Sequence, residues 1–208
     1  ATLALLAVVV GVFGVLAESA RRQQALQRAE AVERFLLGLF GQASLSTREA
    51  ADRPLADLLE DGAAEAAALA AEQPALAAHL LQTIGNAQDQ LDRVSAARSS
   101  YEAAINAARD AGDATIVASA SVALAGMLLR GDGKPERVDA LLGPAVDWLR
   151  RERPESLELA RALGVLAYRR WAGDGETAAE PLLVEAIELM DRHAPAHPDA
   201  AQLRHDLA

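Results

Sequence analysis

The chain has 208 residues, no cysteine and a formal net charge of −10, and 51% of its residues are hydrophobic while only 3% are aromatic. The absence of cysteine excludes a disulfide scaffold and a cysteine-ligated zinc site. The acidic balance, with a single lysine at Lys134, argues against nucleic-acid binding, which needs a basic face to displace phosphate counterions. Abundant alanine and leucine, with few strand formers, predict an all-α fold.

An uncharged apolar run comes first in the chain. Residues 2–17 are apolar or glycine, apart from Thr2, and the run ends at Glu18, Arg21 and Arg22. A helix over this run is roughly 25 Å long, just short of the thickness of a bilayer core. We therefore predict a transmembrane helix over residues 1–17 and a single-pass location in a bacterial inner membrane. Because the chain begins with Ala1 rather than Met, we expect it to start part-way through the span. A buried core helix and a cleaved signal peptide are the alternatives.

A juxtamembrane helix is predicted over residues 18–42. Apolar residues recur there at alternating spacings of four and three, at Ala25, Ala29, Val32, Leu36 and Leu39. This stripe would either pair two chains in a parallel coiled coil, giving a homodimer, or dock onto the helical domain that follows. Four arginines between residues 21 and 34 favour a cytoplasmic position for the downstream chain.

One pattern recurs from residue 73 onward, at a spacing near forty-one residues. A first helix carries a glycine after apolar residues, at Gly85, Gly126 and Gly164, and a second helix carries a large residue followed by an alanine, as in Tyr101 and Ala104. Small residues let paired helices approach closely, and large ones fill the space between hairpins. One hairpin cannot bury its apolar face alone, so the copies must stack. We predict repeats over 73–111, 113–151 and 154–193, with an incomplete fourth from 199, and turns at 131–133 and 173–175.

This order of Leu-Gly, aromatic and alanine positions resembles the tetratricopeptide repeat. Gln88 departs from the family, because it stands where an aromatic residue is usual. The resemblance implies an α-solenoid of stacked helical hairpins whose first helices line a concave groove.

Residues 29–85 resemble a segment of bacterial receptor-type serine/threonine protein kinases, the segment that links the membrane helix to tetratricopeptide repeats. The resemblance is carried by the apolar positions of residues 31–40, the run 54–63 and the run 73–85. It implies a kinase domain before the membrane helix and extracytoplasmic repeats after it, which conflicts with the arginine distribution. Within residues 43–72 we predict linking helices that cap the solenoid, with a helix continuing through Gly62 and a new one starting at Pro74.

Residues that could perform chemistry are scattered. The glycine-rich loop and the catalytic and metal-binding motifs of kinases are absent. Gly133 and Lys134 are followed by Pro135, where a phosphate loop needs Ser or Thr. His193, His197 and His205 are separated by prolines and have no carboxylate at ligand spacing. We predict no catalytic residue, no cofactor and no metal, and therefore no enzyme activity in this chain.

The predicted binding surface is the concave groove, where a protein or peptide would bind; a plain solvated inner surface is the alternative. Its exposed positions are predicted to be His79, Gln82, Asn86, Met127, Arg130, Arg161 and Tyr168. The predicted function is a membrane-tethered, non-catalytic region for protein recognition or signal input to a serine/threonine kinase. A membrane-anchored scaffold without a kinase, and the repeat region of a winged-helix transcription regulator, are the alternatives.

Overall fold

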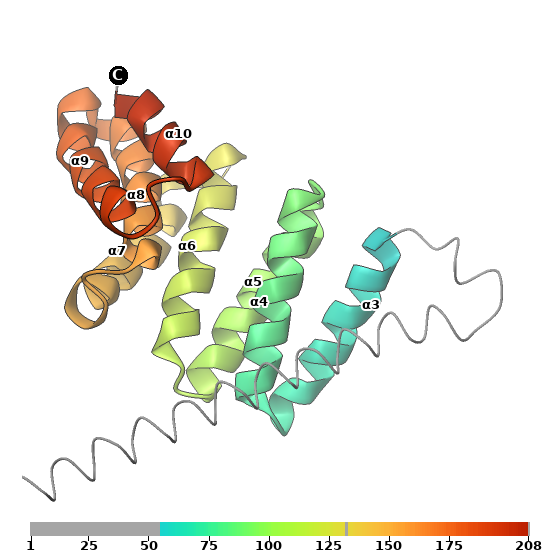
Figure 1. Ribbon diagram of the computed structural model, residues 1–208. Coiled ribbons are helices and arrows are strands. Elements are labelled where there is room, and N and C mark those ends of the chain that lie inside the picture. The colour runs from blue at the N-terminus through green and yellow to red at the C-terminus, as the bar shows by residue number, and fades with distance from the viewer. Residues whose placement is uncertain (1–54, 132, 208) are drawn as a thin grey trace, which may run out of the picture. The chain divides into compact units, whose positions relative to one another are not determined.

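The computed structural model describes residues 55–131 and 133–207, which are helical throughout apart from short connections and contain no strand (Figure 1). The chain divides into two compact units, Ala1–Leu58 and Leu59–Ala208, and the boundary falls inside the first described helix. The juxtamembrane helix over 18–42, its predicted pairing in a homodimer, and the first part of the linking segment lie outside the described residues.

The predicted membrane anchor requires a correction. Among the helices of residues 55–131 and 133–207, none combines the length and the apolar character needed to cross a membrane. The residues assigned to the span, 1–17, lie outside the described part of the chain. The fold class is therefore corrected to all-α, with no membrane-spanning helix among the described residues, and these residues give no support to the predicted location in a bacterial inner membrane.

The linking segment contains α3 (Leu55–Ala68) and the short 3₁₀ helix η1 (Leu69–Ala71), which contacts the next helix. As predicted, α3 continues through Gly62, which is buried. A new helix starts at Pro74, where proline is well tolerated because the first turn leaves its N–H groups unpaired.

Three helical hairpins follow, and then a single helix. The hairpins are α4 (Pro74–Gln90) with α5 (Val94–Asp110), α6 (Ala114–Arg130) with α7 (Pro135–Glu152), and α8 (Leu157–Asp174) with α9 (Glu176–His193); the last helix is α10 (Pro198–Leu207). The predicted repeat ranges cover the same segments. The turn expected over 173–175 is shorter, because α8 includes Gly173 and Asp174 and only Gly175, with φ of 88°, separates it from α9.

The hairpins pack in chain order, as Figure 1 shows for α4, α5 and α6. Each second helix contacts the next first helix, in the pairs α5 with α6, α7 with α8 and α9 with α10. The first helices also contact one another, α4 with α6 and α6 with α8, whereas the backbones of α5 and α7, and of α7 and α9, have few or no contacts. The described part of the second unit is therefore a solenoid-like stack with its first helices on the more closely packed side.

The three equivalent glycines have different roles in this packing. A Cβ on Gly85 would lie 2.9 Å from Cδ1 of Tyr101, in the partner helix of the same hairpin. A Cβ on Gly164 would lie 2.8 Å from Cδ2 of Leu203, in α10. A Cβ on Gly126 would lie 3.6 Å from Val165 Cγ2 and 3.8 Å from Arg130 Nη1, which are ordinary contacts. Close approach therefore requires glycine at two of the three positions.

A buried polar pair replaces the aromatic residue that the repeat pattern leads one to expect at position 88. Gln88 is 2% exposed, and Ser100 of α5, which is 3% exposed, donates a hydrogen bond from Oγ to Gln88 Oε1 at 2.7 Å. Buried polar groups cost free energy unless they are paired. The pair therefore joins α4 to α5 in one register.

Candidate functional site: the first-helix face

The candidate site is the first-helix face, which we define as the exposed side chains of α4, α6 and α8. Equivalent positions on these helices can be counted from Gly85, Gly126 and Gly164. Four residues after each glycine lie Asp89, Arg130 and Tyr168, so the same place on successive hairpins carries an acid, a base and an aromatic ring. Such a face can bind a partner through its side chains.

Six of the seven residues predicted for the site are accessible to some degree. Asn86, Arg130, Arg161 and Tyr168 are exposed, and His79 and Gln82 are half-buried. His79 also accepts a hydrogen bond at its main-chain carbonyl from Thr83 Oγ1, at 2.9 Å. These residues come from three helices that are neighbours in the stack.

Met127 is the exception, and its prediction as an exposed site residue was wrong. Its side chain is only 3% exposed. The reason is the position of its helix, since α6 contacts α4, α5, α7 and α8 and is therefore covered on most sides. Met127 belongs to the core.

Polar site residues of α4 and α6 are joined to each other. Arg130 donates from Nη2 to both carboxylate oxygens of Asp89, at 2.8 and 2.6 Å. Gln82 donates from Nε2 to Ser119 Oγ at 2.6 Å. Both hydrogen-bonded contacts cross from one hairpin to the next. These side chains therefore stabilise the stack in addition to facing solvent.

Asn86 is held within its own hairpin. Tyr101, which is 1% exposed, donates from its hydroxyl to Asn86 Oδ1 at 2.9 Å. Burial, and to a smaller extent the charge of Asp89, raises the pKa of Tyr101 to about 12, while Arg130 acts in the opposite direction. The phenol is therefore neutral at physiological pH and serves as a donor.

Arg161 makes the corresponding contact at the next junction, toward α10. Its Nε donates to Asp199 Oδ2 at 2.9 Å, and its Nη2 lies 3.1 Å from His197 Nε2. The two arginines predicted to meet a ligand are thus both paired with carboxylates of this chain. A ligand carboxylate would have to compete with Asp89 or Asp199 for them.

An exposed aromatic pair remains at the carboxyl end of α8. Tyr168 is 52% exposed and Trp171 is 57% exposed, and their ring centroids are 6.2 Å apart with the planes tilted by 34°. Large aromatic side chains usually bury most of their surface, and Tyr and Trp are enriched at protein interfaces. This pair is the most accessible apolar feature of the first-helix face.

Two histidines of the carboxyl-terminal region, His193 and His197, lie next to carboxylates. His193 Nε2 lies 3.3 Å from Glu155 Oε2, and Arg192 also donates to that oxygen. The hydrogen bonds from Arg192 and then His193 hold the pKa of Glu155 below its ordinary value. Within the described residues, no group of three or more Asp, Glu or His side chains is arranged to hold a metal ion.

Two features of this face, the aromatic pair and the Asp89–Arg130 ion pair, were not predicted from the sequence, although a sequence pattern indicates each of them. Trp171 follows Tyr168 by three residues, which places both on neighbouring parts of a helix surface. Asp89 and Arg130 are forty-one residues apart, the same spacing as the repeat. Opposite charges one repeat apart predict an ion pair between hairpins.

Comparison with known proteins supports the fold. No family model matches the sequence, and no curated protein matches it. The chain is similar to the crystal structure of BtubC (BKLC) from P. vanneervenii, with 21% identity and a TM-score of 0.60, over 89% of this chain and 81% of that chain. At this identity the likeness shows the fold alone, and it is an all-helical, solenoid-like fold.

Proposed function

We propose that this chain is a non-catalytic recognition region of the tetratricopeptide type, and that its first-helix face binds a protein or peptide partner. The observation that carries the proposal is the exposed pair Tyr168 and Trp171, on a helix whose neighbours in the stack also present polar side chains. Rigid helices hold these side chains in fixed positions, which lowers the entropy lost on binding.

The arginines of the first-helix face contribute less to ligand binding than the sequence alone indicates. Arg130 and Arg161 are paired internally, so the charge they offer to a ligand is largely neutralised. The partner we propose therefore docks mainly through apolar or aromatic contacts at the carboxyl end of α8, with hydrogen bonds to polar residues such as Asn86 at the edge.

Selection from a random peptide phage library on the immobilised chain tests this function. We expect enriched peptides whose affinity falls about tenfold or more when Tyr168 and Trp171 are both changed to Ser, as for truncation of aromatic anchors. Val184→Ser is the matched control, because Val184 is an apolar residue of α9 that is 40% exposed. Equal loss in both variants, or no enrichment at all, would contradict the proposal.

We propose further that the region serves recognition or signal input for a bacterial serine/threonine protein kinase. The support for this narrower proposal is the sequence resemblance of residues 29–85. Reading the coding sequence upstream of Ala1 tests it. A kinase domain there would support the assignment, and a winged-helix domain or no kinase would reject it.

A further inference from the structure

The ion pairs of the second unit are concentrated at the junctions between hairpins. The first junction, between the α4–α5 and α6–α7 hairpins, carries Arg130 with Asp89 and Arg137 with Glu102. In both pairs the arginine comes from the later hairpin. The partners are 41 and 35 residues apart in sequence.

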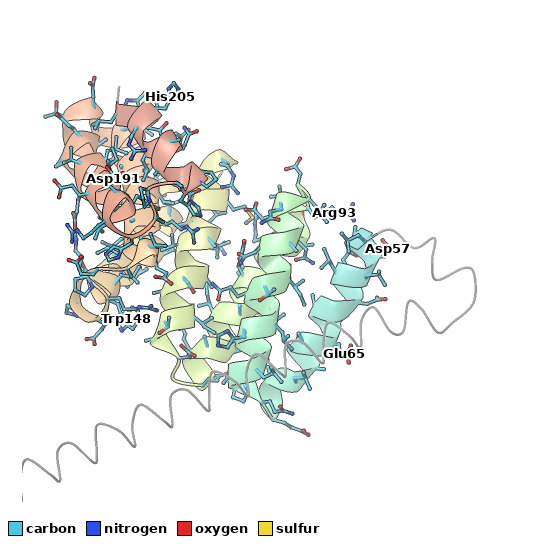
Figure 2. The ribbon with its side chains drawn as sticks, viewed as in Figure 1. Asp57, Glu65, Arg93, Trp148, Asp191 and His205 are labelled. Carbon is cyan, nitrogen blue, oxygen red and sulfur yellow. The ribbon has the colours of Figure 1, made fainter. Side chains whose placement is uncertain are left out.

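The next two junctions repeat the arrangement. Between the α6–α7 and α8–α9 hairpins lie Arg169 with Asp139, at 2.8 Å, and Arg150 with Glu185, at 2.6 Å. Between the α8–α9 hairpin and α10 lie Arg161 with Asp199, at 2.9 Å, and Arg204 with Asp191, a residue labelled on α9 in Figure 2. We call these contacts the junction pairs; within the described residues, each junction carries two of them.

Most side chains of the junction pairs are about half exposed. The side chain of Arg130 is 62% exposed, and the two most covered side chains are those of Asp89, at 25%, and Arg169, at 16%. Exposed ion pairs are weak individually and are screened by salt. Because the pairs lie at the junctions, they stabilise the contacts between hairpins rather than the hairpins themselves.

In a stacked-repeat protein, stability separates into the stability of each repeat and the coupling between neighbours. The junction pairs contribute to the coupling between neighbours, since the two partners of a pair never lie in the same hairpin. We infer that the junction pairs make the coupling between hairpins sensitive to ionic strength, so that salt weakens the stack at its junctions while the helices themselves stay intact.

The chain offers a matched control, because it also has arginine contacts that cross no such junction. Arg170 pairs with Asp174 in the same helix, at 3.0 Å, and Arg109 of α5 donates to Asn106 in its own helix, at 3.5 Å. Changing two arginines to Gln alters the net charge equally in either set. General self-repulsion of this acidic chain, which salt relieves, is therefore the same in both variants.

The experiment compares two double variants by thermal unfolding of the full chain, followed by circular dichroism, in 20 mM and in 500 mM NaCl. The junction variant is Arg130→Gln with Arg137→Gln, and the control variant is Arg109→Gln with Arg170→Gln. At 20 mM NaCl we expect the junction variant to unfold about 3 °C below the control variant. At 500 mM NaCl we expect the two midpoints to agree within about 1 °C, because salt has already screened the pairs that the junction variant lacks.

A charge-swapped variant keeps the test decisive if the junction variant folds poorly. Asp89→Arg combined with Arg130→Asp restores an ion pair at the first junction, and both positions lie in the last turn of their helices, so the interaction with the helix dipoles is balanced. We expect it to unfold within about 1 °C of the unmodified chain at 20 mM NaCl. A midpoint gap that persists at 500 mM NaCl, or a swapped variant that loses as much as the junction variant, would overturn the inference.

Discussion

Gly85 provides the sharpest test of how the hairpins are packed. In Gly85→Ala, the new Cβ would lie 2.9 and 3.0 Å from two carbons of the Tyr101 ring, and 3.4 Å from Ser100 Cβ. Carbon atoms pack best at about 3.5–4.0 Å, so the ring has to move by roughly half an ångström or more. The ring is 1% exposed and its hydroxyl is hydrogen-bonded to Asn86, so there is little space for that movement.

The expected free-energy change follows from two opposing effects. Overpacking a well-filled core costs about 1–3 kcal/mol, whereas alanine in place of glycine within a helix contributes about 0.5–1 kcal/mol. We therefore expect Gly85→Ala to lower the free energy of unfolding by about 1–2 kcal/mol, which lowers the thermal midpoint by about 2–8 °C in a protein of this size. Gly126→Ala is the control, and we expect it to raise stability by about 0.5–1 kcal/mol, since its Cβ would make only ordinary contacts, the nearest at 3.6 Å.

Urea and thermal unfolding, followed by circular dichroism and tryptophan fluorescence, measure both variants. Agreement between the two probes is needed before midpoints are converted into free energies. Adding Tyr101→Leu to both variants removes the ring, and there the penalty of Gly85→Ala should largely disappear. The reasoning would be refuted if Gly85→Ala were as stable as Gly126→Ala.

Three further predictions concern the core, a helix cap and a titrating group. Leu163→Ala, at a position that is 0% exposed, should lower the free energy of unfolding in urea by about 2–5 kcal/mol, and a loss below about 1 kcal/mol would show that the site is not packed. Ser156 caps α8 by accepting a hydrogen bond from the Leu159 N–H at 3.1 Å. Ser156→Ala should therefore lower the free energy of unfolding by about 1 kcal/mol in the same assay, and an unchanged free energy would show that this hydrogen bond does not stabilise the helix. Because the folded-state pKa of Tyr101 is raised from 10.0 to about 12, its contribution to stability is complete below pH 10 and is lost as the pH rises from 10 to 12, by about 2–3 kcal/mol. In a Tyr168→Phe variant, which retains one tyrosine, ultraviolet titration should show a midpoint near 12, and a midpoint near 10 would contradict the burial of this phenol.

Much of the fold could be predicted from the sequence, because its signals are local. Prolines at positions 74, 135 and 198 each begin a helix, and the recurring glycines and alanines mark helices that must pack in pairs. The predicted turn at 173–175 is longer than the observed one, and the reason is also local. Gly175 alone adopts the positive φ that the reversal requires, so the residues before it remain helical.

The candidate site was harder to predict, because exposure depends on neighbouring hairpins. Met127 follows Gly126 as the exposed Asn86 follows Gly85, yet Met127 is buried, because α6 contacts helices on both sides of it in the stack. Arg130 and Arg161 pair with carboxylates that lie outside their own helices. The ion pairs with Asp89 and Asp199 form because neighbouring elements of the stack pack in one register. Sequence periodicity identifies the faces of a helix but does not say which face a distant segment will cover.

The enclosed position of α6 has a consequence for how this protein can change over time. Because α6 contacts four other helices, changes in the volume of its buried residues have to be accommodated by helices of its own hairpin and of the hairpins on either side. The helix α10 contacts α9 and buries only Ala200 and Leu203, so packing constrains fewer of its positions. Mutational tolerance should therefore be lower in α6 than in α10.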